Sequence, residues 1–354
     1  MIKVSSENYK KQLQDKENLF NSYFKDVVSK NIYSSPYHSF RHRCEFGLAE
    51  FKNGFNYSMI EDRKHIEINE YPICSQSIQK LMKNLLQELT KEDVLLNKLF
   101  QIEFQSSRLD EVMVSLIYHK KLDENWIKKI EALKEDLKCS VIGRSKNQKI
   151  VIEKDCVDET YNYMDRKYSI SLFDQCFCQP NPYICEKILS WIFENIDKKD
   201  DVLELHCGVG TFTIFLSRTF NRVLSTENSR PSIKALNHNI KMNQCSNVIS
   251  ARLSEIETLD ALARKRSFRR LNNINLEDFN FNSIFLNPPR SGIDESTLEK
   301  IKEFNQIIYI SCGFSSLQKD IAYLSKSHKT IATGMFDQFP YTEHIESATV
   351  LRKL

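Results

Sequence analysis

The chain has 354 residues, more than one compact core usually serves, so we expect two domains. Hydrophobic residues make up 41% and charged residues 27%, which is ordinary for a soluble globular protein. The net charge of +3 excludes no class of partner, because a nucleic-acid binder can concentrate Lys and Arg on one face.

The N-terminal segment, MIKVSSENYKKQ, has no apolar core and does not resemble a signal peptide. No apolar run approaches the roughly 18 residues of a membrane helix. We therefore expect a cytoplasmic protein without a membrane partner. We also expect a monomer, although these features do not bear on oligomeric state. The ten cysteines are scattered through a chain without an export signal, so we expect reduced thiols rather than a disulfide framework.

The first half of the chain, residues 1–170, mixes two periodicities and predicts an α+β domain. Apolar periodicity predicts helices over Tyr9–Lys30, Ile78–Thr90 and Asn125–Leu137. Strands are predicted around the turn Asn53-Gly54 and further along, at Glu45–Asn53, Ser58–Glu67, Leu99–Phe104, Glu111–Tyr118 and Cys139–Ile142.

In the second half, residues 171–354, strands alternate with helices, which predicts a doubly wound, mostly parallel α/β sheet. The predicted strands are Asp201–Leu205, Asn221–Thr226, Ser283–Leu286, Gln306–Ile310 and Thr330–Met335. The predicted helices are Thr211–Phe220 and Pro231–Met242. The polar segment Ala263–Asp278 reads as a surface insertion.

A glycine-containing turn, His206-Cys-Gly208-Val-Gly210, joins the first of these strands to its helix. Glycine lets the backbone approach a ligand closely, and such sheets bind ligands beyond the carboxyl ends of their strands. Glu227 ends the next strand, where it could accept hydrogen bonds from ribose hydroxyls. Thr213 replaces the third glycine of a dinucleotide site, which favours S-adenosylmethionine (SAM) over NAD. A purely structural turn is the alternative.

Three further segments carry reactive groups: Asn287-Pro-Pro-Arg290 after one strand, Cys312 after another, and Glu346 near the C-terminus. Methylation of uracil at C5 needs these groups. A thiolate that adds to C6 makes C5 nucleophilic, and a base then removes the C5 proton. Arg290 could stabilise charge on a uracil carbonyl oxygen. Taken singly, Cys312 could be a buried small residue and Glu346 a solvated carboxylate.

At these residues the sequence resembles the tRNA (uracil-5-)-methyltransferase family over nearly its whole length. The resemblance is carried by blocks in both halves: residues 37–46, 98–102, 118–123, 142–144, 177–181, 203–208, 288–292, 310–312 and 336–342. The last block, FDQFPYT, is long and highly specific. The family forms 5-methyluridine at the T-loop uridine (U54) of tRNA.

The resemblance implies a Rossmann-like SAM-dependent methyltransferase domain preceded by an α+β RNA-binding domain, and a role for each matched residue. Cys312 matches the nucleophile, Glu346 the base, and Arg290 a residue that holds the uracil. The cofactor positions are Gln179, His206, Gly208, Thr211, Glu227 and Asn287, of which Asn287 also lies next to the uracil. The RNA-binding positions are Phe100, His119 and Arg43, and an aromatic ring there could stack on splayed loop bases. For Phe100, core packing is the alternative. We expect SAM as cofactor, the T-arm of tRNA as partner, and no metal.

The chain departs from the family at several positions of the site. Asn287 stands where Asp is usual, and Gly313-Phe314 follows Cys312 where Asn-Pro is usual. His206 and Thr211 replace an aromatic residue and Asn beside the cofactor turn. These departures put the rate and the loop shape in question.

Other functions remain open. Related ribosomal-RNA enzymes carry an additional barrel and a four-cysteine cluster, neither of which this chain has the length or spacing for. Asn-Pro-Pro also occurs in amino-group methyltransferases, but it is followed here by Arg290 instead of an aromatic residue. A tRNA-binding folding helper with weak catalysis is the second rival. The basic run Arg264–Arg270 is either a phosphate contact or a solvated loop.

Overall fold

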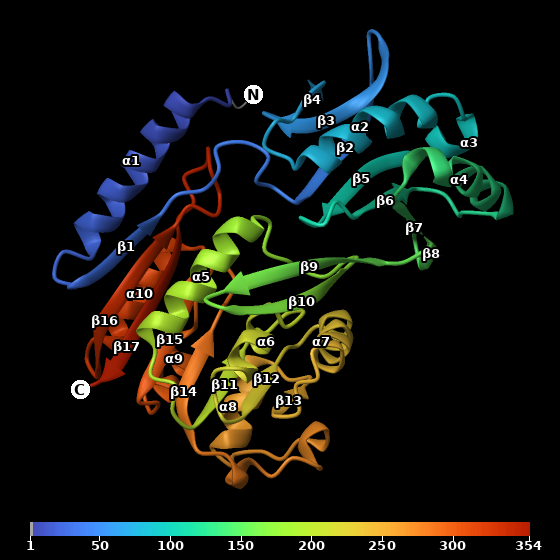
Figure 1. Ribbon diagram of the computed structural model, residues 1–354. Helices are drawn as coiled ribbons and strands as arrows, with labels where there is room; N and C mark the ends of the chain where they lie inside the picture. The colour runs from blue at the N-terminus through green and yellow to red at the C-terminus, as the bar shows by residue number, and fades with distance from the viewer. Residues whose placement is uncertain (1–2) are drawn as a thin grey trace. The chain divides into compact units, whose positions relative to one another are not determined.

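Two separate sheets organise the chain in the computed structural model, which describes residues 3–354 (Figure 1). One compact unit contains the residues up to Ser35, then Tyr161–Ile170 and Gln175–Leu354. The other contains Pro36–Thr160 and Ser171–Asp174. The predicted division into 1–170 and 171–354 is corrected by this grouping. Residues 3–35 belong with the second half, because they contribute a strand to its sheet.

The larger unit is built on an eight-stranded sheet of order β1-β16-β17-β15-β14-β11-β12-β13. Every neighbouring pair is parallel except the two pairs that β17 makes with β15 and β16. The predicted doubly wound, mostly parallel class is confirmed. The strands are β1 (Ser29–Tyr33), β11 (Asp201–Leu205), β12 (Val223–Thr226), β13 (Val248–Ala251), β14 (Phe281–Leu286), β15 (Gln306–Ser311), β16 (His328–Phe336) and β17 (Glu346–Lys353).

Both faces of this sheet are covered, as the apolar composition of its strands requires. In β14, Ile284 and Leu286 belong to a core cluster that includes residues of α1, α8, α9 and α10. Phe285 points the other way, to Phe212 of α6, with ring centroids 5.2 Å apart. The helices are α1 (Ser6–Tyr23), α5 (Pro182–Asn195), α6 (Thr211–Ser217), α7 (Arg230–Met242), α8 (Glu255–Leu262), α9 (Glu295–Ile301) and α10 (Phe314–Leu324).

The N-terminal helix is shorter than predicted. It ends at Tyr23 instead of Lys30, and the next segment forms the edge strand β1. Ser29 to Tyr33 pairs in parallel with β16, and this long-range pairing overrides the helical periodicity of the sequence. Phe20 and Phe24 at the end of α1 are buried in the core of the larger unit.

The smaller unit has a seven-stranded sheet of order β4-β3-β2-β5-β6-β7-β8, with helices α2, α3 and α4. Its elements are β2 (Arg43–Phe51), β3 (Gly54–Glu61), β4 (Lys64–Ile68), α2 (Gln76–Leu89), α3 (Asp93–Leu96), β5 (Leu99–Ser106), β6 (Val112–Tyr118), α4 (Glu124–Leu137), β7 (Ser140–Ser145) and β8 (Gln148–Ile152). The predicted α+β character of this region is therefore observed.

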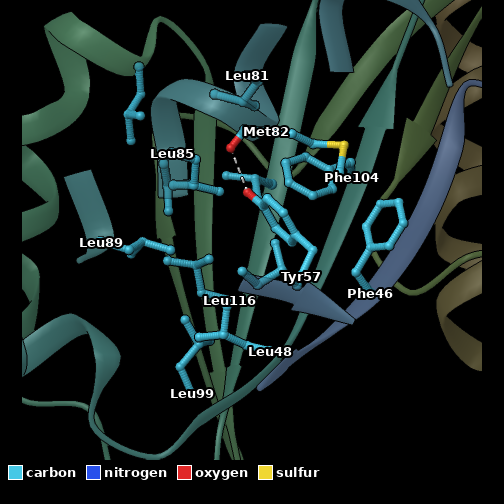
Figure 2. Packing of buried hydrophobic residues seen from close by; sticks show 14 of the residues in the cluster. Phe46, Leu48, Tyr57, Leu81, Met82, Leu85, Leu89, Leu99, Phe104 and Leu116 are labelled. Atoms are coloured by element: carbon cyan, nitrogen blue, oxygen red, sulfur yellow. Dashed lines mark hydrogen bonds between the residues drawn. The ribbon is translucent and has the colours of Figure 1, made fainter. Parts of the chain in front are cut away.

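The core of the smaller unit lies between its sheet and α2 (Figure 2). Tyr57 packs between Phe46 and Phe104, at ring-centroid distances of 5.6 and 5.9 Å. Its hydroxyl donates a hydrogen bond of 2.9 Å to the backbone oxygen of Met82 in α2. Burying a tyrosine in this way is favourable because its one polar atom keeps a partner.

The predicted strand Ser58–Glu67 is in fact a hairpin. Its turn residues, Asp62 and Arg63, have φ values of 48° and 64°, the left-handed values that tight hairpin turns need. Neither Gly nor an Asn-Gly pair stands at this point, so local turn signals do not predict the turn. A second ribbon, β9 (Cys156–Tyr163) with β10 (Arg166–Phe173), was also unpredicted and is shared by the two units.

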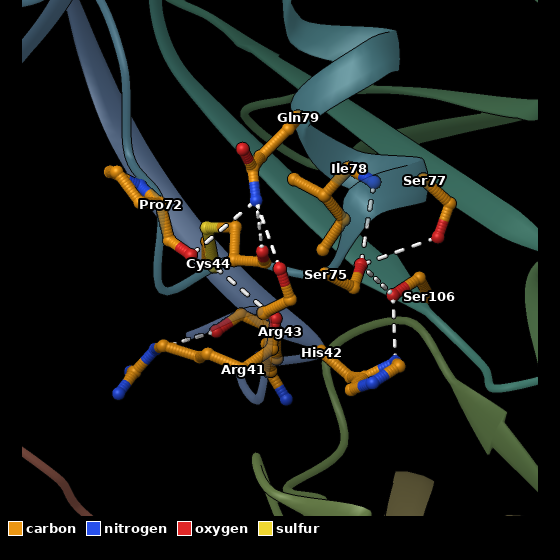
Figure 3. The surroundings of a disulfide bond; sticks show 12 residues. Arg41, His42, Arg43, Cys44, Pro72, Ser75, Ser77, Ile78, Gln79 and Ser106 are labelled. Carbon is orange, nitrogen blue, oxygen red and sulfur yellow. Dashed lines mark hydrogen bonds between the residues drawn. A yellow bond between two sulfur atoms is a disulfide. The ribbon is translucent and has the colours of Figure 1, made fainter. Parts of the chain in front are cut away.

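Cys44 and Cys74 form a disulfide in the smaller unit, so the expectation of reduced thiols is wrong for this pair (Figure 3). The two residues are 30 positions apart in sequence. They meet because Arg41 pairs with Cys74 in an isolated bridge, which brings the start of β2 alongside the loop before α2. Sequence spacing cannot reveal such a tertiary neighbour.

Candidate active site

The sheet of the larger unit brings the predicted reactive residues to one edge. His206, Glu227, Asn287 and Cys312 each directly follow the last residue of β11, β12, β14 and β15. Because these strands are parallel, their carboxyl ends share one edge of the sheet. β17 runs the opposite way and begins at Glu346, so its first residue lies at that same edge.

Strand register places Cys312 beside Glu346. In the antiparallel pair of β15 and β17, Ser311 is the partner of Ser347. Continuing this register by one residue on each strand places Cys312 opposite Glu346. The sequence suggested no strand at Glu346, so this juxtaposition depends on β17, which was not predicted.

Burial and one cation set the ionisation of these two groups. Glu346 is only 3% exposed, and burial raises its pKa to about 8, against a smaller opposing effect of Arg290. Burial also raises the pKa of the half-buried Cys312 thiol, and the Glu346 charge adds to the rise. A hydrogen bond from Arg290 and its positive charge lower the Cys312 pKa again. The three side chains therefore interact directly.

The unusual Gly313 after Cys312 has a clear structural reason. A Cβ at this position would lie 2.3 Å from the backbone oxygen of Arg290 and 2.6 Å from Oγ of Ser316. The same Ser316 hydroxyl donates a 2.8 Å hydrogen bond to the Arg290 oxygen. The loops that carry Cys312 and Arg290 thus approach so closely that only glycine fits between them. Phe314, the next residue, begins α10 and packs against aromatic rings of α1.

The turn after β11 has the geometry of a ligand cradle. Gly208 and Gly210 have φ values of 56° and 93°, and a Cβ on Gly210 would lie 2.5 Å from Leu236. The carboxylate of Glu227 accepts hydrogen bonds from the backbone N–H groups of Gly208, at 3.2 Å, and Ser229, at 2.8 Å. Each carboxylate oxygen keeps a further lone pair for a ribose hydroxyl. The residues present thus fit the adenosyl group predicted for this turn.

The two residues that depart from the family at this turn are both accounted for in the structure. His206 has a left-handed backbone, with φ of 59°, and its Nε2 lies 2.7 Å from Oε2 of Glu255 at the start of α8. Thr211 is buried as the first residue of α6, and its backbone oxygen accepts a hydrogen bond from Tyr168. Both lie beside the glycines, as predicted.

Two buried polar residues at this edge were not singled out from the sequence. Gln338 donates a 2.7 Å hydrogen bond to Oε1 of Gln179, a predicted cofactor residue. Glu204, inside β11, accepts hydrogen bonds of 2.6 Å from Thr213 and Ser225. Burial raises the Glu204 pKa to about 7, which these hydrogen bonds oppose. The FDQFPYT block could have indicated Gln338, and a carboxylate between two leucines inside a buried strand could have indicated Glu204.

The predicted RNA-binding residues lie in the smaller unit. Phe100 of β5 and His119 after β6 stack in parallel, with ring centroids 3.8 Å apart and planes 7° from parallel. His119 is exposed and Phe100 is half-buried, so Phe100 is not a core residue. Arg43 is half-buried at the start of β2. The sheet holds the ring pair in place because β5 and β6 are hydrogen-bonded neighbours.

The basic run Arg264–Arg270 is not a free cationic patch. Arg264 pairs with Glu277 and Arg270 with Glu257, while Phe268 is buried in a small apolar cluster. The run precedes β14, whose carboxyl end carries the site, and Figure 1 draws it toward the opposite end of the sheet. This placement favours the solvated-loop interpretation.

The described residues contain neither a metal-binding cluster nor a membrane-spanning helix. Within residues 3–354, no group of three or more His, Cys, Asp or Glu side chains is arranged to hold a metal ion. No helix in this same range is long and apolar enough to cross a membrane.

Comparison with known proteins identifies the family. The family model for tRNA (Uracil-5-)-methyltransferase matches residues 8–354. The tRNA/tmRNA (uracil-C(5))-methyltransferase of Pseudoalteromonas atlantica is 37% identical, over 99% of this chain and 98% of that relative. The enzyme of the same name from Acinetobacter baylyi is 39% identical, over 98% of this chain and 99% of its own.

A solved structure shares the fold. The tRNA (uracil-54, C5)-methyltransferase of Pyrococcus abyssi, crystallised with S-adenosyl-L-homocysteine, superimposes with a TM-score of 0.74 at 18% identity. The match covers 97% of this chain and 83% of that one. The family model and the sequence relatives cover almost the whole chain, and the sheet edge brings together Cys312, Glu346 and the glycine turn. The chain therefore belongs to the tRNA (uracil-5-)-methyltransferase family.

Proposed function

We propose that this protein transfers a methyl group from SAM to C5 of the T-loop uridine, U54, of tRNA through a covalent adduct on Cys312. The observation that carries the proposal is the meeting of Cys312, Glu346 and Arg290 at the edge that also holds the glycine turn. A thiol, a carboxylate and a cation are the groups that the C5 reaction needs. The family membership indicates that the target nucleobase is uracil and that the RNA is tRNA.

In the proposed reaction the Cys312 thiolate adds to C6 of the uracil, which forms an S–C bond and makes C5 an enolate carbon. SAM, when bound, would supply the methyl group to C5, and its S–CH3 bond would break to leave S-adenosyl-L-homocysteine. The Glu346 carboxylate then takes the C5 proton, the C5–C6 double bond forms again, and the S–C6 bond breaks to release the thiolate. Arg290 stabilises the negative charge on the uracil oxygen and on the thiolate.

The cofactor contacts follow from the cradle geometry. The Glu227 carboxylate would accept hydrogen bonds from the ribose hydroxyls of SAM, and the glycine turn would let the cofactor approach the backbone closely. Thr211, Gln179 and His206 would be the other residues that hold SAM. Asn287, which directly follows β14, accepts the uracil N3–H with its side-chain oxygen. An amide serves for this contact as a carboxylate does, but without a charge.

Recognition of the tRNA is assigned to the smaller unit. The stacked rings of Phe100 and His119 offer a flat surface on which an unstacked loop base continues the stack. Arg43 adds a positive charge on the same sheet for a phosphate.

The experiment uses purified protein, labelled SAM and unmodified tRNA, followed by identification of the methylated nucleoside and its position. Wild-type protein should give 5-methyluridine at U54, Cys312→Ala should give none, and Cys156→Ala, another half-buried thiol, should behave as wild type. Product that persists in Cys312→Ala would exclude the covalent mechanism. Methyl on N6 of adenosine would favour an amino-group methyltransferase, and tight tRNA binding without product would favour a folding helper.

A second measurement observes the adduct directly. A tRNA that contains 5-fluorouridine at U54 has no C5 proton for Glu346 to remove, so the methylated adduct should accumulate. Denaturing electrophoresis should then show a SAM-dependent protein–RNA band with wild type and no band with Cys312→Ala.

A further inference from the structure

Asp337 lies in the Phe336–Thr342 block and has no role in the proposed reaction. Side chains on one face of α1 nevertheless interact with its carboxylate. Its side chain is fully buried and accepts hydrogen bonds from Lys16 Nζ, at 2.7 Å, and Gln12 Nε2, at 3.0 Å. Tyr9 also interacts with it. Positions 9, 12 and 16 are spaced to lie on one face of a helix, so α1 presents all three side chains to one carboxylate.

Lys16 makes a second bond that reaches further into the site. Its ammonium also donates to the backbone oxygen of Phe339, at 2.9 Å, and the Lys16 side chain is only 5% exposed. One buried cation therefore holds both the first and the last residue of the turn Asp337-Gln338-Phe339. Burial lowers the Lys16 pKa, and the neighbouring Asp337 carboxylate opposes that shift.

Gln338 and Phe339 of this turn contact residues of the candidate site. The ring of Phe339 lies under the Arg290 guanidinium, 5.8 Å from centroid to Cζ. The side chain of Gln338 donates to Gln179, and both are almost wholly buried. Displacement of this turn would therefore move a residue proposed to act on uracil and another proposed to act on SAM.

We propose that Lys16 is a positioning residue for methyl transfer, which holds the 337–339 turn so that Phe339 orients Arg290 and Gln338 orients Gln179. The inference rests on the proposed roles of Arg290 and Gln179. Lys16 touches neither substrate nor cofactor in this account, and α1 acts as a support of the site.

The test compares three variants by steady-state methylation of tRNA at saturating and at varied SAM. Lys16→Met keeps an unbranched side chain as far as Cε but removes both hydrogen bonds and leaves Asp337 as a buried charge without its cation. The double variant Lys16→Met/Asp337→Asn removes that charge too, although the Phe339 oxygen still lacks its donor. Lys300→Met is the matched control, because Lys300 forms a 2.8 Å pair with Asp260 elsewhere in the same unit.

We expect Lys16→Met to lower kcat by about tenfold or more and to raise the KM for SAM, since small displacements of catalytic groups can cost as much as about a hundredfold. Its Tm should fall, because removing one partner of a buried pair is strongly destabilising. The double variant should regain most of the Tm but keep the low kcat. Lys300→Met should match wild type in kcat and KM.

Two results would overturn the inference. One is a Lys16→Met kcat within twofold of wild type at a temperature where the variant is folded. The other is a double variant whose kcat recovers together with its Tm, which would make Lys16 important only for stability. The protein–RNA band formed with 5-fluorouridine tRNA tests the covalent step separately. The kcat comparison measures only the formation of 5-methyluridine, so its outcome does not depend on whether that band appears.

Discussion

At the scale of single residues, the candidate site holds the carboxyl group of Glu346 in a buried position, where little water solvates it. Burial raises the Glu346 pKa to about 8, so near neutral pH most of the free protein carries this carboxyl group protonated. Arg290 opposes that shift and also lowers the pKa of Cys312. The cation therefore promotes ionisation of both the proposed nucleophile and the proposed base.

A pH–rate profile should report this arrangement. We expect kcat/KM to rise as pH increases through about 8, since Glu346 must be ionised to accept the C5 proton. Arg290→Gln should move the rising limb to higher pH and lower the maximum, because the charge that favours both anions is gone. Arg222→Gln, which breaks an ion pair with Asp201 instead, should leave the midpoint where it is. A midpoint unchanged by Arg290→Gln would contradict the electrostatic role.

Glu346 should also cost stability as pH rises. Its folded pKa lies above the ordinary value of 4.5, so the folded state binds the proton more tightly. The stability that this proton provides is complete below about pH 4.5 and is lost as pH rises toward about 8. Glu346→Gln has no such loss, so its free energy of unfolding relative to wild type should increase by a few kcal/mol from pH 5 to pH 9, at about 1.4 kcal/mol per pKa unit. Urea unfolding at both pH values measures this, and an equal difference at the two would refute it.

At the scale of elements, one antiparallel strand and one glycine complete the site. β17 returns along β15 and β16, which is why Glu346, far from Cys312 in the sequence, reaches the same edge. Gly313 then lets the loop after β15 lie against the loop after β14. The departure from the family pattern at Gly313 is thus compatible with a well-formed loop.

Gly313→Ala should disturb both loops at once. The added Cβ would meet the Arg290 backbone oxygen at 2.3 Å, and backbone cannot move aside as a flexible side-chain end can. We expect kcat to fall by about tenfold or more, and stability to fall by about 1–3 kcal/mol, the usual cost of overpacking. Ser315→Ala, at an exposed position in the same segment, is the control. Methylation kinetics and thermal unfolding check both values, and a fully active Gly313→Ala would show that the close approach is dispensable.

At the scale of the whole molecule, the candidate functional groups are distributed over two units. The larger unit carries the candidate chemistry and the cofactor cradle, and the smaller unit carries the stacked pair Phe100 and His119. Residues 3–35 join the larger unit through β1 and through the contacts of α1 with Asp337. For this reason, we expect deletion of the segment that ends at Ser35 to damage the larger unit, which carries the candidate site.

The proposed division of tasks predicts separable defects. Phe100→Ala should weaken tRNA binding by about tenfold, since stacking of one base contributes about 1–3 kcal/mol. It should leave S-adenosyl-L-homocysteine binding unchanged, because the cradle belongs to the other unit. Phe55→Ala, an exposed aromatic of the same sheet, is the control. Filter binding and calorimetry measure the two affinities, and equal tRNA binding by the two variants would count against the stacking surface.

The sequence alone determined the fold class, the order of the reactive residues and the family. Buried apolar runs such as Asp201–Leu205 predict parallel strands, and short reactive segments directly after them predict a site at the carboxyl edge. These features are local in sequence, which is why periodicity and spacing reveal them.

Only the tertiary structure decided what depends on contacts between distant segments. The strands β1 and β17, the Cys44–Cys74 disulfide and the pairing of Lys16 with Asp337 each join residues far apart in the chain. Local propensity carries no record of such partners, because burial and pairing appear only when the sheets assemble. The pKa of Glu346 belongs to this group as well, since it is the surrounding core that removes water from the carboxylate.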